Sequence, residues 1–421
     1  MNGNDKMELF RTAPDYIVYI PYGIGVEGLP DSANEHFLVF RRKDGTLAAV
    51  WTQSGFEGEY NQHIVFSGSD AHGRIWTPPR VIAGRDPDPA TGRGMCSWGY
   101  PLVSRSGRIY VLYSKHMGVN DIFTHTTGAL HGIFSDDGGE SWSPEAPVEL
   151  PRTIWDNPDP AIPTNCITWQ KPLRFGDGRY LAGVTRWVSP SRYPAPPVGE
   201  GWYNDDSVVD FLRFENLDED PDCADLKITL LTPDERSLRY PIPGHPGRTL
   251  IQEPSLVELP DGRLLAVMRS VSGHPLYALS CDCGEHWSEP EILTYGDGLP
   301  AMEHPLSPCP CYRLNETEYL FFFHSHGADF GPWRSHDGRV RRPVYLALGR
   351  FVPDARQPIR FSAPIFFMDN DNVELNRRCD LALYASFEEV DGRPVLFYPD
   401  RKHFLLGRII RPELLAGAVF P

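Results

Sequence analysis

Short apolar runs alternate with turn residues along the whole chain. The runs are typical of β-strands, because each is about four to eight residues long and rich in aliphatic and aromatic residues. Pairs of runs are joined by a turn, and five of the six turns carry glycine. The turns are Asp44-Gly45, Ser106-Gly107, Asp177-Gly178, Asp261-Gly262, Asn315-Glu316 and Asp391-Gly392. The pattern therefore predicts six β-hairpins.

The hairpins recur at a steady period. From Gly45 to Gly392 the mean step is about 69 residues, a length that suits a four-stranded blade. Six such units account for nearly the whole chain. We therefore predict an all-β fold, a six-bladed β-propeller of four-stranded antiparallel blades that forms one domain over residues 1–421. The segments DYIVYIPY near the start and HFLLGRII near the end are expected to close the last blade.

A second motif marks another set of turns. Residues 280–287 have the form Ser-x-Asp-x-Gly-x-x-Trp, and residues 135–142 have the same form at the same offsets. A worn copy over residues 69–76 has its acid one position early, at Asp70. Ser and Asp side chains can cap backbone N–H groups in a turn, Gly takes a φ that other residues avoid, and Trp can fold back over the turn. Two clean copies and a worn one indicate a repeated supersecondary unit.

Hairpin geometry predicts which residues share one mouth of the propeller. The start of the first strand and the end of the second strand lie at the same end of a hairpin. We aligned the starts through a proline, as in Tyr100-Pro101 and Glu253-Pro254. The predicted lining consists of Tyr100, Lys171, Glu253 and His304 at the starts, Tyr384 in the sixth unit, and His116, Arg186, Arg269, His324 and Arg401 at the ends. A cationic mouth favours an anionic ligand, and arginine forks suit a carboxylate.

The overall charge excludes some partners. The chain has 421 residues and a formal net charge of −16, which argues against nucleic acid and anionic membranes as partners. No apolar run of about 18 residues exists, so no membrane span is expected. The first residues lack the apolar core of a secretory signal, which predicts a cytoplasmic protein if the chain begins natively.

The eight cysteines fit free thiols in such a protein. Cys281-x-Cys283 and Cys309-x-Cys311 lack the usual Cys-x-x-Cys spacing and a nearby pair of histidines. We therefore expect neither a metal site nor a cofactor.

The two clean boxes resemble the Asp-box repeats of the sialidase superfamily. Two further stretches are similar to functional segments of that family. IQEPSLVELPDGRLLAVMRS matches the segment that carries a glutamate and an arginine of the carboxylate-binding triad, which would be Glu253 and Arg269. LYASFEEVDGRPVLFYP matches the segment of the nucleophilic tyrosine, which would be Tyr384. The resemblance implies a six-bladed propeller that acts on an acidic sugar.

The chain departs from the family at two places. Glu35-His36-Phe37 stand where the first blade of sialidases has Arg-Ile-Pro, so the first arginine of the triad is missing. No aspartate matches the general acid, for which Glu57 and Glu59 are the candidates. Arg342 is the candidate for the third arginine.

The leading hypothesis is a glycoside hydrolase for an acidic, carboxylate-bearing sugar of an oligosaccharide. Glu253 would take the proton of Tyr384 as that phenol attacks the sugar, since an unperturbed phenol, with a pKa of about 10, is a weak nucleophile. Arg269, with Arg186 or Arg401, would hold the substrate anion.

Two alternatives remain at this stage. A uronate oligosaccharide lyase would need an Arg or Lys to stabilise the enolate and a His or Tyr to take the proton, for which Arg186 or Lys171 and His116 or Tyr100 are candidates. A non-catalytic carbohydrate-binding propeller would rely on aromatic side chains instead. Its candidates are Trp98, Trp169, Trp187, Trp202 and Trp333.

Overall fold

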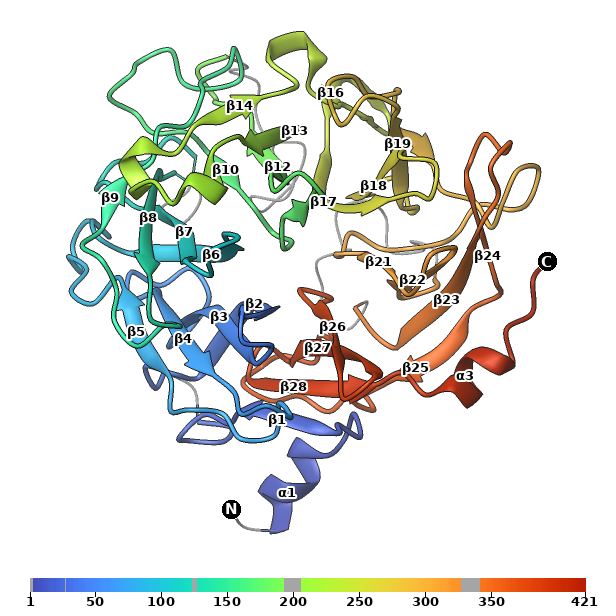
Figure 1. The fold of residues 1–421 in the computed structure, drawn as a ribbon, viewed down its shortest axis with the longest axis horizontal. Coiled ribbons are helices and arrows are strands. Elements are labelled where there is room, and N and C mark those ends of the chain that lie inside the picture. The colour runs from blue at the N-terminus through green and yellow to red at the C-terminus, as the bar shows by residue number, and fades with distance from the viewer. Residues whose placement is uncertain (1–2, 27, 123–126, 193–205, 327–340) are drawn as a thin grey trace.

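Six small antiparallel sheets form a ring, as the sequence predicts (Figure 1). The computed structural model of the chain describes residues 3–26, 28–122, 127–192, 206–326 and 341–421. Trp202 and Trp333 lie outside the described residues. The fold is an all-β, six-bladed β-propeller, which confirms the predicted fold class.

The first three blades follow one another along the chain. The first contains β2 (Ala33–Arg41), β3 (Leu47–Ser54), β4 (His63–Gly68) and β5 (Arg80–Ala83). The second contains β6 (Cys96–Val103), β7 (Ile109–Lys115), β8 (Ala129–Ser135) and β9 (Ala146–Pro147). In the third, β10 (Cys166–Ile167) and β11 (Leu173–Arg174) both pair with β12 (Tyr180–Trp187), and β13 (Ser207–Phe214) and β14 (Ile228–Leu230) complete the sheet.

The last three blades close the ring. The fourth contains β17 (Ile251–Glu258), β18 (Leu264–Ser270), β19 (Leu276–Ser280) and β20 (Glu291–Ile292). The fifth contains β21 (Cys311–Arg313), β22 (Glu318–Phe323), β23 (Val344–Phe351) and β24 (Ile359–Phe361), and β25 (Ile365–Met368) also pairs with β23. The sixth contains β26 (Ser386–Val390), β27 (Arg393–Asp400), β28 (Phe404–Ile409) and β1 (Tyr16–Tyr19). A strand from the start of the chain thus completes a blade built from its end.

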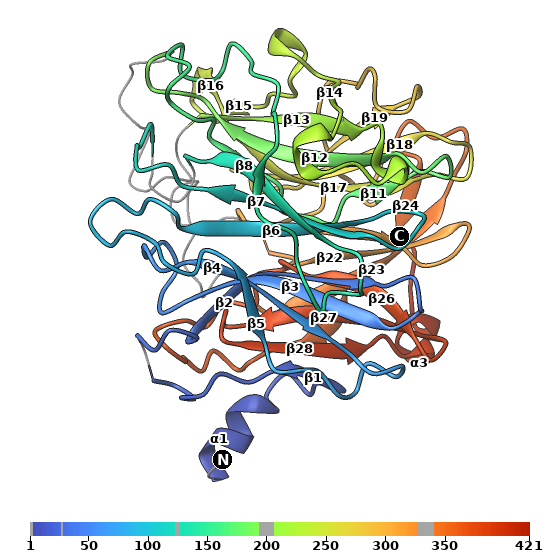
Figure 2. The same cartoon turned by 60° about the vertical axis from the view of Figure 1, so that its left-hand side comes forward.

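A few elements decorate the propeller. The helix α1 (Gly3–Leu9) lies beside the last blade, next to β1 (Figure 2), and α3 (Pro412–Ala416) follows β28. The hairpin of β15 (Pro241–Ile242) and β16 (His245–Thr249) precedes the fourth blade, and three 3-10 helices span Leu217–Glu219, Cys223–Asp225 and Asp234–Arg236. Among the described residues, no helix is both long and apolar enough to cross a membrane.

Each of the six predicted turns joins the first and second strands of a blade, which confirms the hairpin period. The Ser-x-Asp-x-Gly-x-x-Trp boxes join the third and fourth strands. In the copy over residues 280–287, Ser280 Oγ accepts a hydrogen bond from Gly284 N at 2.9 Å, and Trp287 Nε1 donates to Gly284 O at 3.0 Å. The indole of Trp287 stacks on Phe211 of the preceding blade, with ring centroids 4.0 Å apart. The box therefore fastens one blade to the next.

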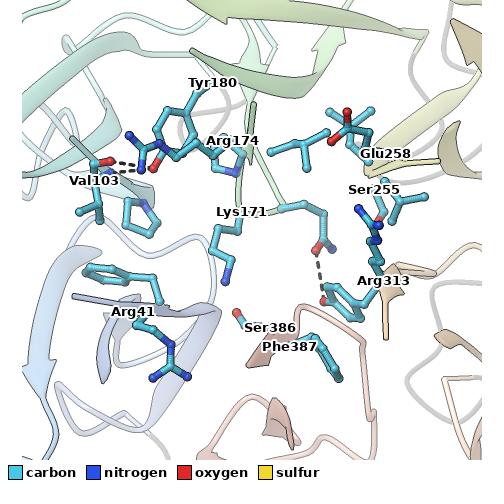
Figure 3. A pocket seen from close by; sticks show the side chains of 18 of the residues that line it. Arg41, Val103, Lys171, Arg174, Tyr180, Ser255, Glu258, Arg313, Ser386 and Phe387 are labelled. Atoms are coloured by element: carbon cyan, nitrogen blue, oxygen red, sulfur yellow. Dashed lines mark hydrogen bonds between the residues drawn. The ribbon is translucent and has the colours of Figure 1, made fainter. Parts of the chain in front are cut away.

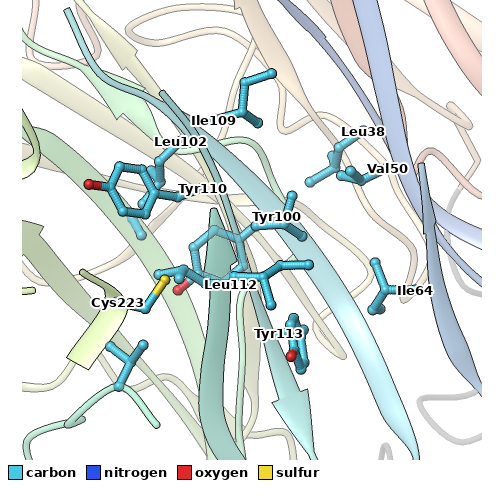
Figure 4. Packing of buried hydrophobic residues seen from close by; sticks show 14 of the residues in the cluster. Leu38, Val50, Ile64, Tyr100, Leu102, Ile109, Tyr110, Leu112, Tyr113 and Cys223 are labelled. Atoms are coloured by element: carbon cyan, nitrogen blue, oxygen red, sulfur yellow. The ribbon is translucent and has the colours of Figure 1, made fainter. Parts of the chain in front are cut away.

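The core lies between neighbouring blades rather than along the axis alone. Figure 4 shows one such layer, in which Leu38 and Val50 of the first blade pack against Tyr100 and Leu112 of the second. Because every blade presents an apolar face to each neighbour, the rigid ring holds the ends of its innermost strands in fixed positions.

Candidate active site

The innermost strand of three blades carries a β-bulge near its start. The register of β2, β6 and β17 shifts at these points. His36, Trp98 and Glu253 lie within the bulges and adopt positive φ values of 52°, 54° and 57°. Bulges re-aim side chains, and such strained backbone is concentrated at functional sites. The three blades therefore turn one side chain each out of the regular alternation.

A threonine of the preceding blade supports two of the bulges. Thr52 Oγ1 accepts a hydrogen bond from Trp98 N, and Thr185 Oγ1 accepts one from Glu253 N, both at 2.8 Å. All four residues are buried. The strained backbone is thus held from the neighbouring sheet, which fixes the position of Glu253.

Glu253 faces a buried arginine and a buried tyrosine. Its Oε1 lies 3.1 Å from Arg269 Nη1, and both side chains have no exposed surface. Burial raises the pKa of Glu253, although the charge of Arg269 opposes the shift. Burial and the charge of Glu253 raise the pKa of Tyr384. The tyrosine is therefore neutral, and Glu253 is a stronger base than a carboxylate in water.

The hydrogen bonds of this group are incomplete. Nε and Nη2 of Arg269 both donate to Gln252 Oε1, at 3.0 and 2.6 Å. Among the described residues, neither oxygen of Glu253 nor Nη1 of Arg269 has a hydrogen-bond partner of good geometry. Buried polar atoms without partners are costly, so native proteins keep few of them. In this arrangement the Glu253 carboxylate and one guanidinium edge form an ion pair at 3.1 Å without an aligned hydrogen bond.

A second ionic cluster lies against the same tyrosine. Lys402 Nζ is 5.1 Å from the centroid of the Tyr384 ring and pairs with Glu35 at 3.1 Å and Glu57 at 2.6 Å. Arg378 Nη2 pairs with the other oxygen of Glu57 at 2.7 Å. Two carboxylates and two cations thus lie together beside Tyr384, with Glu35 and Lys402 buried and Glu57 and Arg378 partly exposed.

The two carboxylates of this cluster differ in protonation. Burial and the charge of Glu57 raise the pKa of Glu35 to about 7. Burial also disfavours the charge of Glu57, but Lys402 and Arg378 outweigh it and lower the pKa of Glu57 well below its usual value. Near neutral pH the cluster therefore holds a proton on Glu35 and a negative charge on Glu57.

Aromatic rings surround the tyrosine. The Trp169 ring stacks on Tyr384, with centroids 5.2 Å apart and planes at 21°. His36 and Trp98 lie edge-on or tilted to the same indole at 6.0 and 5.8 Å, and Trp187 lies at 6.5 Å. Burial lowers the pKa of His36 to about 3, so its imidazole is neutral. These rings limit access of water to the site.

Arg341 is a further cation of the site that the sequence analysis missed. It is 3% exposed, and its charge lowers the pKa values of Glu253 and Tyr384, against the effect of burial. The sequence-based candidate Arg342 instead pairs with Asp369, with Nε 2.8 Å from Oδ1. Arg341, and not the predicted Arg342, is therefore the arginine near Glu253.

His304 and His324 lie near this group, but their ring nitrogens are already used. The two rings stack 5.3 Å apart. His304 Nδ1 accepts from His324 N and its Nε2 donates to Ser307 O. His324 Nδ1 donates to Pro343 O, and its Nε2 accepts from Ser307 Oγ. Burial lowers the pKa of both imidazoles. Both rings support the backbone here, and their placement does not favour the predicted contact with substrate.

Three other predicted ligand-binding residues are engaged elsewhere. Arg186 donates to Asp156 and Asp210, both at 2.7 Å, and all three side chains are buried. Arg401 pairs with Asp400 and with Glu8 of α1.

His116 Nε2 contacts Asn120 Oδ1 at 2.9 Å, and its Nδ1 accepts a hydrogen bond from Gly118 N. Internal partners thus occupy groups that the sequence assigned to substrate.

The positions of Tyr100 and Lys171 show that the proline alignment was wrong in the second and third blades. Tyr100 lies in the apolar layer between the first two blades, and Lys171 lines a cavity at the turn end of the innermost strands. The residues that lie at the level of Glu253 are found by counting from the turn instead. His36, Trp98, Trp169 and Glu253 each stand nine positions before their turn glycine. Pro101 and Pro172 stand six positions before it and Pro254 eight, so these prolines are not equivalent.

The described residues contain no group of three His, Cys, Asp or Glu side chains arranged to hold a metal ion. Cys281 and Cys283 are exposed, whereas Cys309 and Cys311 are buried.

Comparisons with known proteins agree with this architecture. The model of the BNR repeat-like domain matches residues 45–389, most of the chain. The chain belongs to this family. A comparison with curated proteins gave no match. Among solved structures, this BNR repeat-like chain is similar to a protein of unknown function from Dyadobacter fermentans, with 15% identity, a TM-score of 0.61, and coverage of 95% of this chain and 99% of that one.

Two enzymes share the propeller. The NanB sialidase from Streptococcus pneumoniae is 11% identical with a TM-score of 0.62, over 95% of this chain and 71% of that one. An α-L-arabinanase from Penicillium chrysogenum is 12% identical with a TM-score of 0.56, over 97% and 99%. At these identities the likeness shows a shared sialidase-like fold.

Proposed function

We propose that this BNR repeat-like chain is a glycoside hydrolase that acts on an acidic, carboxylate-bearing sugar in an oligosaccharide. The observation that carries the proposal is the buried group of Tyr384, Glu253 and Arg269, in which the Glu253–Arg269 contact at 3.1 Å is not a hydrogen bond of good geometry and neither Glu253 oxygen has one among the described residues. A propeller that needed these residues only for stability would be expected to satisfy them, as it satisfies Arg186.

The first step is attack of the Tyr384 oxygen on the anomeric carbon. Glu253 takes the phenolic proton as the new carbon–oxygen bond forms and the glycosidic bond breaks. The raised pKa of Tyr384 makes this base necessary, and the raised pKa of Glu253 makes it a better proton acceptor. Water then attacks the anomeric carbon and gives a proton to the group that protonated the leaving oxygen, while the bond to the tyrosine oxygen breaks and Glu253 returns its proton to the tyrosine. A neutral nucleophile also avoids repulsion from the carboxylate of the sugar.

The leaving oxygen needs a proton, and Glu35 is our candidate donor. Its pKa of about 7 keeps it protonated through mildly acidic pH, whereas the lowered pKa of Glu57 keeps that residue ionised. Arg269 and Arg341 would bind the carboxylate of the sugar, and Lys402 would supply positive charge in place of the missing first arginine.

A lyase is less well supported. Its candidate groups do not converge, because Arg186 is neutralised by two aspartates, Tyr100 is packed between blades, and Lys171 lies at the turn end of the innermost strands. The arabinanase and sialidases among the similar structures favour an enzyme that acts on glycosides, without indicating the sugar.

The test is a screen of acidic oligosaccharides that contain sialic, glucuronic or galacturonic acid, read by mass spectrometry. We expect products that have gained one water. Tyr384→Phe and Glu253→Gln should each lower turnover by about 100-fold or more, whereas Tyr100→Phe, a matched change to another buried tyrosine, should keep it. Products of elimination, which absorb in the ultraviolet, or sugar binding without turnover would overturn the proposal.

A further inference from the structure

A cavity of about 680 Å³ lies on the propeller axis at the end opposite to the bulges. Its rim is formed by the turns that join first and second strands, with Lys43 and Arg105 beside two of them. Figure 3 shows Lys171 reaching into its centre, with Arg41, Arg174 and Arg313 around it. The candidate active site does not use these residues.

Four of the cations that line the cavity share two carboxylates. Glu388 pairs with Lys171 and with Arg41. Asp218 pairs with Arg174 and with Arg105, at 2.9 and 3.4 Å. Each carboxylate therefore serves two cations, which leaves a positive excess on the wall.

Three more lining cations have no carboxylate partner among the described residues. Arg42 donates to Thr46 Oγ1 and to the carbonyls of Ser69 and Gly138. Lys43 donates to Ser106 O, and Arg313 to Asn315 O. All of these acceptors are neutral, so none of the three charges is paired in a salt bridge within the described part of the chain, and of the three only Arg42 acts on a nearby carboxylate, that of Asp44. Glu258 is the single acidic residue among those that line the cavity.

The walls between these charges are apolar. Phe40, Leu173, Leu256 and Phe387 line the cavity, and Tyr312 stacks on Phe387 with ring centroids 5.6 Å apart. A concave site with apolar walls and a few convergent charges is typical of a small-molecule site. On a chain of net charge −16, a cavity with a positive excess would concentrate small anions locally.

We propose that this cavity binds a small organic anion with two or more negative charges and a compact apolar body. Arg42, Lys43 and Arg313 would contact the charged groups, Lys171 would reach the ligand from the centre, and the apolar walls would cover the rest. This site is separate from the proposed glycosidase chemistry and does not depend on it.

The cavity and the candidate active site share their supporting strands. Gln170, Ser255 and Ala385 line the cavity, and they stand one or two positions after Trp169, Glu253 and Tyr384. Ser255 Oγ also bonds to the backbone of Cys311 in the next blade, at 3.0 Å from its nitrogen. A ligand in the cavity would therefore contact the same innermost strands that hold the buried site.

The experiment is titration calorimetry of the full chain with pyrophosphate and with citrate, together with fluorescence of anilinonaphthalene sulfonate, an aromatic anion. We expect saturable binding that weakens as salt is added. The double variant Lys43→Gln/Arg313→Gln should weaken binding by about tenfold or more, since it removes two cations that have no salt bridge among the described residues. Preference for pyrophosphate or for citrate indicates whether the natural ligand carries phosphate or carboxylate groups.

A matched control removes two exposed cations outside the cavity, in Arg85→Gln/Lys227→Gln. This pair changes the net charge equally and should leave binding unchanged. Lys171→Met tests in the same way whether the cation at the centre of the cavity contributes to binding. The proposal is overturned if the wild type shows no saturable binding, if the control pair weakens binding as much as the cavity pair, or if Tyr384→Phe abolishes binding.

Discussion

Arg186 and Arg269 occupy similar places in neighbouring blades but have different surroundings. Each lies near the end of a second strand and has no exposed surface. Arg186 donates to two buried aspartates at 2.7 Å, and Asp210 in turn accepts from Ser237. Arg269 has a neutral glutamine on two nitrogens and a poorly aligned glutamate on the third. Burial of the cation alone therefore does not distinguish the two arginines, whereas the completeness of their internal bonding does.

The largest expected effect is on stability, in Arg186→Leu. This change leaves Asp156 and Asp210 buried without their cation, which should lower the free energy of unfolding by about 3–5 kcal/mol. Urea unfolding followed by tryptophan fluorescence measures the change. Arg269→Leu is the matched control and should cost less than half as much, because it leaves one buried carboxylate without its cation instead of two. Equal losses in the two variants would contradict the comparison.

The second prediction concerns activity, for which we expect Arg269 to matter more than Arg186. Arg269→Gln should lower kcat/KM for an acidic substrate by about 100-fold or more, the typical effect of removing one charged or hydrogen-bonding group from a catalytic site. Arg269→Lys should recover part of the loss, because the charge returns without the fork. Steady-state kinetics on the substrate found in the screen measures both. An unchanged kcat/KM in Arg269→Gln would show that this arginine, like Arg186, only supports the fold.

The same comparison explains what the sequence can predict. The apolar runs and the turns between them recur in every blade because every blade must bury the same kind of apolar face, so the six-bladed fold follows from their period. Glycine in five of the turns and a box in three of the blades support the same period. Glu253, Arg269 and Tyr384 are marked by family segments, and the structure brings them together. Whether they bind a substrate stays a prediction.

The remaining site residues depend on contacts that the sequence does not display. Asp156 is 30 residues from Arg186 and neutralises it from a loop. Lys402 meets Glu35 across 367 residues, through closure of the ring. The proline stands eight positions before the turn glycine in the fourth blade but six in the second and third, so the proline alignment chose Tyr100 and Lys171 instead of Trp98 and Trp169. Ring closure, contacts from loops and the unequal positions of the prolines are thus the three sources of error.

Lys402 can be compared with Arg186, because each lies between two carboxylates. The two differ in that one partner of Lys402, Glu35, is protonated. The pKa of Glu35 is raised from 4.5 to about 7 in the folded chain. Its contribution to stability is therefore fully present below about pH 4.5 and is lost as the pH rises through about 7. Glu35→Gln should remove this dependence, a change on the order of 2 kcal/mol between pH 5 and pH 8.

The matched control for this titration is Glu57→Gln. The pKa of Glu57 is lowered in the folded chain, so its contribution is present above its usual pKa and is lost as the pH falls. Urea unfolding of the wild type and both variants at about pH 3, 5 and 8 separates the two signs, because Glu35 titrates between the upper two values and Glu57 below pH 5. If Glu35→Gln keeps the pH dependence of the wild type, Glu35 does not hold the proton. Activity of the wild type should likewise fall above about pH 7 as Glu35 loses its proton.

The smallest expected effect tests whether the bulge supports the site or only the fold. Thr185 and Thr52 accept the same bond, from Glu253 N and Trp98 N, at the same 2.8 Å. Thr185→Val and Thr52→Val each leave a buried N–H without a partner, which should lower the free energy of unfolding by about 1–2 kcal/mol in both. Only Thr185→Val moves the backbone of Glu253, so only this variant should also lower kcat. An equal fall in kcat in the two variants would mean that the bulges act through general stability, and the special position of Glu253 among them would be lost.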